Sequence, residues 1–379
     1  MTDRPASAAL LVFVGLGCGS PTEATGRTAT ASPASSSPPA VSATGVAAPL
    51  PSAKVPATST TAPSVASPAP SAPGAPSLVR DTCPKEDPSF TPTGQYSHKR
   101  TRLFVHSQGS PRHAASDVVV RAGAAPTIEG KFTYGKGGKD LEDEEISLFI
   151  RDRSCAWLSV GTGFTNDDGW VSISVPETLT VSPGVYAFQL VVRGDGSRAE
   201  GNLFAVSPKT PAVVFDVDAT LTTSDQELFD ELVEGKVPEA RPNGRDVANE
   251  LADSHLLVVY LTGRPYFLGP TTRRWLESNG FPGGFVRTTK RLEEARPTPG
   301  GVGTYKEAAL TELASAGLDL KLAYGNAPTD VCAYAKAGID PKKTFILGPH
   351  GGEACDGHAP SQALSGYDAH VGRTGDILR

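Results

Sequence analysis

The sequence predicts an all-β sandwich followed by an α/β domain with a parallel sheet, both preceded by a segment without a folded core. Three observations lead to this prediction. Residues 19–78 contain 12 of the 33 prolines and only three charged residues. Residues 117–206 consist of short alternating apolar segments that end in Gly-rich turns. From residue 208 onward, buried-strand runs alternate with helical stretches, which is the pattern of a parallel sheet covered by helices.

Overall composition limits the functional classes. The chain has 379 residues and a net charge of −6, so a general nucleic-acid-binding protein, which would carry a basic surface, is not expected. No apolar run reaches the roughly 18 residues that an ordinary transmembrane helix needs. At about 150 residues per domain, the length allows for two folded domains beside the proline-rich segment.

The N-terminus has the features of an export signal. Residues 1–18 contain an apolar stretch from Ala6 to Leu16, too short to span a bilayer, which is followed by Gly17 and Cys18. We expect a signal peptide of the lipoprotein type in which Cys18 is lipidated, and a disordered Pro/Ala/Ser/Thr-rich linker over residues 19–81. The predicted location is the cell envelope, on the periplasmic or surface side. The alternative is a cytosolic start with an accidental apolar run.

The cysteines leave several arrangements open. If Cys18 carries lipid, four remain, and four cysteines allow three pairings. Pairing within each predicted domain favours Cys83 with Cys155 and Cys332 with Cys355. Four free, partly buried thiols are the alternative. None of the spacings is typical of a zinc site.

The middle domain, residues 82–207, is predicted to be an immunoglobulin-like β-sandwich. Alternation places Ile146, Leu148 and Ile150 on one face, and seven short strands at this spacing are typical of such sandwiches. The acidic segment TNDDGW is interpreted as a hairpin turn rather than a calcium loop. No catalytic cluster and no partner are indicated for this domain. The predicted strands are 117–122, 127–134, 145–151, 156–165, 170–175, 185–193 and 199–206.

The C-terminal domain, residues 208–379, is predicted to hold a parallel sheet with helices on both faces. Ligands bind such sheets at the carboxyl ends of the strands. The predicted strands are 212–218, 255–262, 283–288, 320–325 and 343–348, and the predicted helices are 225–235, 245–253, 270–279, 304–316 and 328–337.

Polar residues follow three of these strands. Asp216 and Asp218 end the first strand and point the same way, so their carboxylates repel unless a cation or a proton transfer uses them. Thr262 ends the second strand, and Asp330 follows the fourth. Three carboxylates at one edge are hard oxygen ligands suited to Mg²⁺.

Lys306 is predicted to face the same edge. Thr304 and Glu307 form a T-x-x-E capping box, so the helix is expected to begin at Thr304. Lys306 then lies in the first turn, where a cation opposes the helix dipole unless it contacts anions. A solvated surface lysine is the alternative.

These motifs resemble the haloacid dehalogenase superfamily of phosphatases. The order is D-x-D-x-T, a Thr after a strand, a helical Lys and G-N-x-x-T-D, within residues 208–379. A closer resemblance, to the lipin-type phosphatidate phosphatases, is carried by VVFDVDATLTTSD, YLTGRPYFLGPTTRRWLESNG and YGNAPTDVCAYAKAGI. Lipin-like bacterial proteins similarly have a β-sandwich ahead of this domain. The resemblance implies a Rossmann-like parallel sheet of the haloacid dehalogenase type.

The resemblance also implies a mechanism. Asp216 would be the nucleophile that forms an aspartyl-phosphate, and Asp218 would protonate the leaving alcohol and then activate water. Mg²⁺ would be bound by Asp216, the backbone carbonyl of Asp218, and Asp330. Ala219 departs from the Gly or Asp usual in the family, which puts activity in doubt if a positive φ is needed there. The residues expected to bind the phosphoryl group are Thr262, Gly263, Arg264, Lys306 and Asn326, with Asn326 also orienting the water shell of the metal.

The substrate class is less closely defined. The stretches between the motifs, 221–254 and 264–303, are too short for a lid domain, so the site is predicted to be capless and open. Residues 264–296 carry seven basic and three acidic side chains, which indicates either an anionic lipid surface or a solvated helix face. The leading prediction is a Mg²⁺-dependent phosphatase of phosphatidate or a related lipid phosphate at a phospholipid membrane. The alternatives are a phosphatase of soluble or polymeric phosphomonoesters and a phosphatidate-binding module without turnover.

Overall fold

The computed structural model describes residues 83–379 except 136, 180 and 224–236. The expected signal peptide with Cys18, the linker 19–81 and the expected helix 225–235 therefore lie outside the described residues. Within the described part, no helix is both long enough and apolar enough to cross a membrane.

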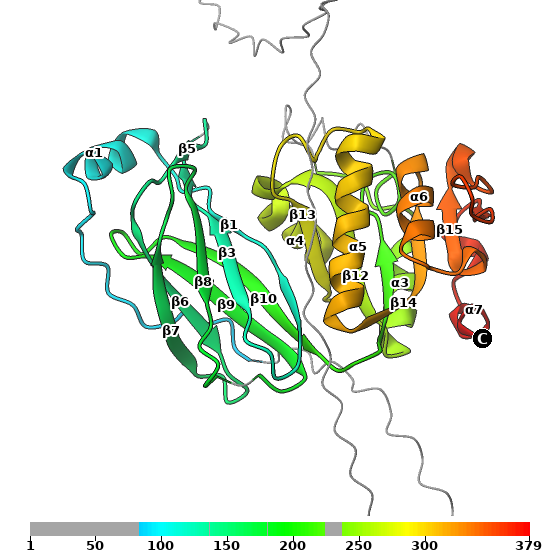
Figure 1. The fold of residues 1–379 in the computed structure, drawn as a ribbon, viewed down its shortest axis with the longest axis horizontal. Helices are drawn as coiled ribbons and strands as arrows, with labels where there is room; N and C mark the ends of the chain where they lie inside the picture. The colour runs from blue at the N-terminus through cyan, green and yellow to red at the C-terminus, as the bar shows by residue number, and fades with distance from the viewer. Residues whose placement is uncertain (1–82, 136, 180, 224–236) are drawn as a thin grey trace, which may run out of the picture. The chain divides into compact units, whose positions relative to one another are not determined.

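The middle part is a β-sandwich, as the alternating segments predict (Figure 1). Its described residues form a sheet in the order β1-β3-β8 and a second sheet in the order β2-β10-β9-β6-β7, and the small pair β4-β5 lies beside them. Each of the seven predicted strands is present, whereas helix α1 and the two-residue strands β1 and β5 were not predicted. The bounds are α1 Lys99–Gln108, β1 Ala114–Ala115, β2 Val118–Arg121, β3 Thr127–Lys131, β4 Thr133–Tyr134, β5 Lys139–Asp140, β6 Glu145–Arg151, β7 Trp157–Phe164, β8 Trp170–Ser174, β9 Gly184–Val192 and β10 Arg198–Val206.

Alternation along the strands builds the sandwich core. Ile146, Leu148 and Ile150 of β6 are buried together, as their shared face predicts. The TNDDGW segment forms a hairpin turn, in which the side-chain oxygen of Asn166 accepts hydrogen bonds from the backbone N–H groups of Asp168 and Trp170.

The C-terminal part contains a parallel sheet. Its described strands lie in the order β13-β12-β11-β14-β15-β16, and every neighbouring pair is parallel. The predicted strands are confirmed, and the short strand β16 adds an edge that its sequence did not indicate. The bounds are β11 Thr210–Phe215, β12 Leu257–Pro265, β13 Phe285–Thr289, β14 Leu318–Gly325, β15 Thr344–Leu347 and β16 Gln362–Leu364.

Helices cover both faces of this sheet, as predicted. Val214 and Val259 pack on one face with residues of α5 and α6, whereas Val213 and Val258 pack on the other with residues of α3 and α4. The helical bounds are α3 Gly244–Asp253, η1 Tyr266–Leu268, α4 Gly269–Ser278, η2 Pro299–Gly303, α5 Thr304–Ala316, α6 Pro328–Lys336, η3 Pro341–Lys343, η4 Gly348–His350, η5 Tyr367–Ala369 and α7 Thr374–Leu378.

The predicted capping box of α5 is wrong, although the helix does begin at Thr304. A π-helical turn, η2, leads directly into α5, so the cap position is Gly303 and has helical backbone angles. The Thr304 hydroxyl donates instead to the carbonyl of Pro299 at 3.1 Å, and Glu307 forms an ion pair with Lys336. A preceding turn that is already helical leaves no free N-terminal N–H groups for a box to cap.

The sandwich and the parallel sheet share apolar and polar contacts within the compact unit Ala69–Arg379. Val119 and Phe204 of the sandwich belong to the same buried cluster as Phe285 of β13. Asp117 is fully buried, and its carboxylate accepts from the backbone N–H of Val286 at 2.8 Å and from Arg273 of α4.

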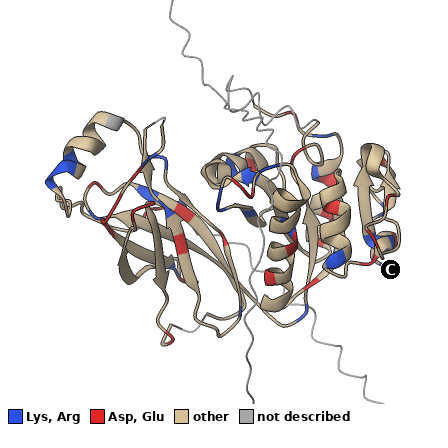
Figure 2. Ribbon diagram, turned by 45° about the horizontal axis from the view of Figure 1, so that its top comes forward, with Lys and Arg blue, Asp and Glu red and all other residues tan. Residues whose placement is uncertain are grey.

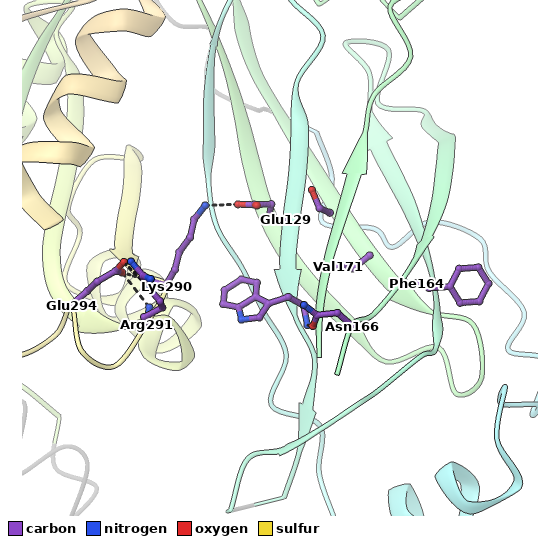
Figure 3. Close-up of a pocket in the computed structure, with 9 residues that line it drawn as sticks. Glu129, Phe164, Asn166, Val171, Lys290, Arg291 and Glu294 are labelled. Atoms are coloured by element: carbon purple, nitrogen blue, oxygen red, sulfur yellow. Dashed lines mark hydrogen bonds and ion pairs between the residues drawn. The ribbon is translucent and has the colours of Figure 1, made fainter. Parts of the chain in front are cut away.

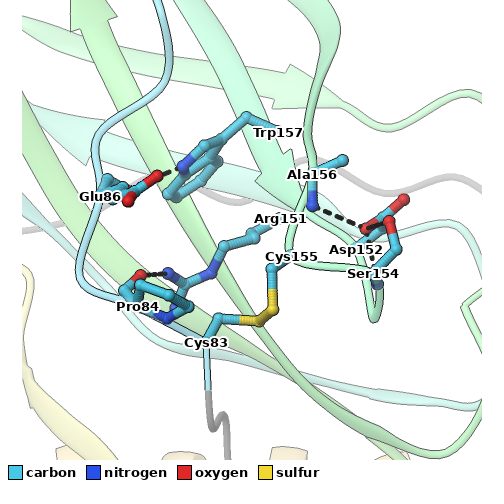
Figure 4. Close-up of a disulfide and its surroundings, with 9 residues drawn as sticks. All are labelled: Cys83, Pro84, Glu86, Arg151, Asp152, Ser154, Cys155, Ala156 and Trp157. Carbon is cyan, nitrogen blue, oxygen red and sulfur yellow. Dashed lines mark hydrogen bonds between the residues drawn. A yellow bond between two sulfur atoms is a disulfide. The ribbon is translucent and has the colours of Figure 1, made fainter.

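Two disulfides join the cysteines in the pairing that domain assignment favours. Cys83–Cys155 fixes the start of the described chain to the turn after β6, where Arg151 donates to the carbonyl of Pro84 at 2.7 Å (Figure 4). Cys332–Cys355 joins α6 to the segment after η4. The alternative of four free thiols is therefore excluded.

Candidate active site

The predicted site residues converge at the carboxyl edge of the parallel sheet. Asp216 and Asp218 follow β11, Thr262 lies near the end of β12, and Asn326 follows β14. Strands β12 and β14 flank β11 on either side. The loops that follow these three strands therefore meet at one edge, which is where sheets of this type bind ligands.

Lys306 lies between two carboxylates. Its Nζ is 2.6 Å from Asp216 Oδ1 and 2.6 Å from Asp330 Oδ1, and the lysine is only 3% exposed. The alternative of a solvated surface lysine is thus excluded. The other oxygen of Asp330 accepts from the backbone N–H groups of Asn326 and Ala327, at 3.0 and 3.1 Å. Asp330 therefore orients the lysine and also caps the N-terminus of α6.

Burial dominates the electrostatics of this pair. It raises the pKa of Asp216 to about 7; the Lys306 ammonium opposes that rise, and the carboxylates of Asp330 and Asp218 add to it. For Lys306, burial disfavours the charged form, but the two carboxylates outweigh it and raise the pKa of the ammonium above its usual range. The lysine is consequently a fixed positive charge beside the expected nucleophile.

Asp218 is held by groups that were predicted to bind phosphate. Arg264 donates to Asp218 Oδ1 from Nε at 3.0 Å and from Nη2 at 2.8 Å, and Thr262 donates to Oδ2 at 3.0 Å. Thr262 and Arg264 are 0% exposed, whereas the Asp218 side chain is 15% exposed. The carboxylate therefore covers both donors.

The loop between Asp218 and Thr222 makes a tight turn. Ala219 has a φ of 54°, in the left-handed region that an L-residue with a Cβ rarely adopts. Its N–H donates to the Thr222 hydroxyl at 2.9 Å. The Arg241 guanidinium donates to the carbonyls of Ala219 at 2.7 Å and of Thr220 at 3.2 Å. The motif alone gave no indication of Arg241.

Gly263 is constrained by packing. A Cβ at this position would lie 2.4 Å from Val302 Cγ2, so a larger residue would push η2 away from β12. This close approach keeps Thr262 and Arg264 at the edge of the sheet beside Lys306, which follows η2 in the chain.

The side-chain amide of Asn326 lies among oxygens. Turned with its nitrogen inward, it donates to Thr220 Oγ1, Asp216 Oδ2 and the carbonyl of Asp218, each at 3.1 Å. Turned with its oxygen inward, it faces acceptors only. Such a convergence of oxygens is the donor chemistry of a hard cation, and neighbouring ligands of octahedral Mg²⁺ are about 3 Å apart.

The donor set fits Mg²⁺ with one change from the predicted ligands. Asp216 and the carbonyl of Asp218 remain suited to the metal, but both oxygens of Asp330 are already engaged, and Asn326 takes its place in the geometry. Among the described residues, no group of three or more His, Cys, Asp or Glu side chains could hold a metal. A site built from one carboxylate, one carbonyl and one amide escapes that pattern.

The basic segment 264–296 is largely neutralised within the fold. Five of its seven basic side chains form ion pairs with carboxylates: Arg264, Arg273, Arg287, Lys290 and Arg291. Figure 2 shows Lys and Arg interspersed with Asp and Glu rather than gathered on one face. The local charge excess in the sequence therefore reflects structural pairing more than a surface for anionic lipid.

A separate cleft of about 610 Å³ lies beside this edge of the sheet (Figure 3). Lys290 and Arg291, which follow β13, line it together with Phe164 and Trp170 of the sandwich. Phe164 is 59% exposed. None of the lining residues belongs to the carboxylate cluster, so the cleft could receive only a part of a ligand that extends beyond the phosphoryl group.

Comparisons with known protein families agree with the two-part organisation. Residues 213–348 match the family model of the LNS2 domain of PITM 1-3, and residues 111–205 match that of the PITM 1-3 β-sandwich domain. The chain thus has a β-sandwich followed by a haloacid dehalogenase-like α/β fold.

The chain is similar over most of its length to membrane-associated phosphatidylinositol transfer proteins. It is 31% identical over 312 residues to protein 1 of Rattus norvegicus, a match that covers 78% of this chain and 24% of the relative. It is 28% identical over 295 residues to the protein retinal degeneration B of Drosophila melanogaster, covering 76% and 22%. The chain spans about a quarter of the length of the curated relatives it matches.

A solved structure with a similar arrangement is the cobalt-bound deoxy-D-mannose-octulosonate 8-phosphate phosphatase of Haemophilus influenzae. The match has a TM-score of 0.29 and 20% sequence identity, and it covers 45% of this chain and 86% of that one.

The relatives contradict the expected localisation. They are named as membrane-associated phosphatidylinositol transfer proteins, not as exported lipoproteins. The prediction of an exported, lipid-anchored protein of the cell envelope is therefore wrong. It rested on residues 1–81, which lie outside the described part of the chain, and an apolar run followed by a cysteine is a short pattern that also arises without export.

Proposed function

We propose that this protein is a Mg²⁺-dependent phosphomonoesterase that acts on a lipid phosphate through an aspartyl-phosphate. The observation that supports it most is the buried cluster in which Lys306 lies 2.6 Å from both Asp216 and Asp330. A purely structural ion pair needs no second aspartate at the same strand tip, whereas phosphoryl transfer uses Asp216 and Asp218 in different roles.

The proposed reaction has two steps. Asp216 attacks the phosphorus, the bond from phosphorus to the leaving oxygen breaks, and Asp218 supplies the proton that this oxygen takes up. Water then attacks the aspartyl-phosphate while Asp218 accepts its proton, which releases inorganic phosphate and regenerates Asp216. Lys306 stabilises the charge on the phosphoryl oxygens throughout.

A divalent cation would be held by Asp216 Oδ2, the carbonyl of Asp218 and the side-chain oxygen of Asn326. When bound, Mg²⁺ would supply charge neutralisation at the phosphoryl group and would favour the ionised form of Asp216. The amide of Asn326 is expected to rotate so that its oxygen faces the cation, since its nitrogen satisfies the same three oxygens in the absence of metal.

The lipid substrate is proposed on two grounds. The relatives are named for phosphatidylinositol transfer and for membrane association. Beside the phosphoryl site, the cleft offers apolar surface that a soluble sugar phosphate would not use, including Phe164, and Leu292 close by is 58% exposed. Phosphatidate is the simplest lipid phosphomonoester that fits both.

A second candidate is a phosphatidate-binding module without turnover. The names of the relatives favour it, because they describe lipid transfer rather than hydrolysis. The hold of Arg264 and Thr262 on Asp218 also favours it, because a carboxylate in those contacts is not free to reach a leaving group.

Phosphate release from phosphatidate in mixed micelles separates these candidates. With Mg²⁺ the proposed enzyme should release inorganic phosphate, and with EDTA it should not. A soluble phosphomonoester, assayed in parallel, tests the soluble-substrate alternative. Binding of phosphatidate vesicles without phosphate release under either condition would establish the non-catalytic candidate.

The matched control is Asp216→Asn. An amide cannot form an acyl-phosphate, so turnover should fall to background, while the loss of one of three crowded carboxylates should leave the folded protein intact. Thermal unfolding checks the fold. Undiminished turnover in a folded Asp216→Asn protein would exclude this nucleophile.

A further inference from the structure

The contacts of Asp218 are unusual for an acid that must reach a leaving group. Its carboxylate oxygens accept from Arg264 Nε at 3.0 and 3.1 Å, from Arg264 Nη2 at 2.8 Å and from Thr262 Oγ1 at 3.0 Å. Charge-assisted hydrogen bonds of this kind are among the stronger ones in proteins. Each oxygen thus has donors pointing at it, and a proton on either would meet a donor.

Thr262 makes the arrangement exclusive. A hydroxyl has one proton to donate, and Thr262 gives it to Asp218 Oδ2 while its oxygen accepts from the backbone N–H of Arg264 at 3.1 Å. Thr262 therefore cannot donate to a phosphoryl oxygen and to Asp218 together. Both donors are also buried behind a carboxylate that is itself partly exposed.

From these contacts we infer that Thr262 and Arg264 form an anion site that Asp218 occupies in the resting protein, and that an incoming phosphoryl group displaces it. The displaced carboxylate is then free to turn toward the leaving oxygen. Substrate binding and release of the acid become one event, which rests on the proposed function for its catalytic meaning but not for the binding itself. Any phosphate dianion, whether free or at the end of a lipid, presents the same chemistry to these donors.

Inorganic phosphate is the probe, titrated calorimetrically into the full chain at a fixed magnesium concentration. Asp218→Asn keeps the shape but replaces the carboxylate by a neutral acceptor, which competes less well for Arg264 and Thr262. Because charge-assisted hydrogen bonds are roughly twice as strong as neutral ones, the dissociation constant for phosphate should fall by about tenfold.

Removal of a negative charge near the ligand would also tighten binding, so a double-mutant cycle is needed. Asp218→Asn is repeated in a Thr262→Val background, which is isosteric, and in an Arg264→Gln background. If Asp218 blocks these donors, its gain in affinity should shrink toward onefold in both. An equal gain in all backgrounds would reduce the effect to charge repulsion and would overturn the inference, as would no gain at all.

The design separates this inference from the proposed function. Should Arg264→Gln fail to fold, as thermal unfolding would show, the Thr262→Val cycle decides alone. Coupling without phosphate release from phosphatidate would keep the anion site and remove the turnover. Turnover without coupling between positions 218 and 262 would keep the enzyme and remove the displaced carboxylate.

Discussion

Ala219 is a strained residue at the centre of the candidate site. Its φ of 54° places the Cβ where an L-residue loses roughly 1 kcal/mol or more relative to a right-handed conformation. The bonds from Arg241 to the carbonyls of Ala219 and Thr220 hold the loop in this turn. The family's frequent glycine at this place therefore has a physical reason that the sequence alone left open.

Ala219→Gly should stabilise the protein. Glycine adopts the left-handed region without a Cβ clash, although it adds backbone entropy to the unfolded chain, so the net gain should be on the order of 0.5 to 1 kcal/mol. Equilibrium unfolding in urea measures it. Ala335→Gly in the helix α6 is the matched control and should lose about 1 kcal/mol. Equal losses at both positions would contradict the strain.

His113 makes the sandwich sensitive to acid. The backbone N–H of Thr133 donates to its Nδ1 at 3.2 Å, and Nε2 contacts Ser197 Oγ at 2.8 Å, so a second proton on the ring would break a buried hydrogen bond. Burial lowers the pKa of His113 from 6.5 to about 4, and the nearby charge of Asp195 opposes that shift.

The sign of the pH effect follows from that direction. The unfolded chain takes up the proton near pH 6.5 and the folded protein only near 4, so the contribution of His113 is complete above pH 6.5 and is lost as pH falls toward 4. The loss should be roughly 3 kcal/mol at 1.36 kcal/mol per pKa unit. Unfolding free energies at pH 7 and pH 4.5 measure it, and His113→Gln should be less sensitive to acid by about this amount. Parallel profiles for both proteins would rule out His113 as the cause.

Local sequence patterns predicted which residues meet at the site but not how they pair. The order of motifs along alternating strands and helices brought Asp216, Thr262 and Lys306 to one edge, because the carboxyl ends of parallel strands share an edge. Arg241 and the partner of Arg264 could not be anticipated. Each depends on a long-range contact, and neither follows a period of 2 or 3.6 residues.

At the scale of elements, the strands were predictable because burial on one face or on both leaves a period that the eye can follow. β6 and β9 alternate, and β12 is apolar throughout. The three-residue β16 and the π-helical turn η2 were missed, since neither is long enough to show a period. The same turn explains why the sequence signature at Thr304 marked the start of α5 but not its cap.

The Cys332–Cys355 bond should stabilise the element that carries Asp330. Both α6 and the segment after η4 are fixed by it, and the two cysteines are 23 residues apart in sequence. In the chain-entropy model a closed loop of that length contributes about 3 kcal/mol. Chemical denaturation of the Cys332→Ser, Cys355→Ser protein should show a loss of this size, and an unchanged unfolding free energy would mean that the folded state loses as much in strain as the unfolded chain loses in freedom.

At the scale of the whole molecule, the sandwich and the parallel sheet should unfold together. They share a buried cluster that includes Val119 and Phe285, and Asp117 connects them from a fully buried position. Its carboxylate accepts from Arg273 and from the backbone N–H groups of Asn202 and Val286, at 2.6 Å for Asn202 and 2.8 Å for Val286. A single calorimetric transition is therefore expected for the described part of the chain.

Asp117→Ala should break that cooperativity. It leaves the mostly buried Arg273 without its carboxylate and leaves two backbone donors unsatisfied, and removing one partner of a buried ion pair typically destabilises by about 3–5 kcal/mol. We expect the transition to move down and to split, because the loss falls on the contact between the two parts rather than inside either. Glu129→Gln is the matched control: it removes another ion pair between the same two parts, with Lys290, whose side chains are 38% and 39% exposed. That variant should change stability by less than about 1 kcal/mol and keep one transition. If Asp117→Ala also unfolds in one transition with a loss as small as that of Glu129→Gln, the apolar cluster alone couples the two parts and Asp117 does not contribute to their cooperativity.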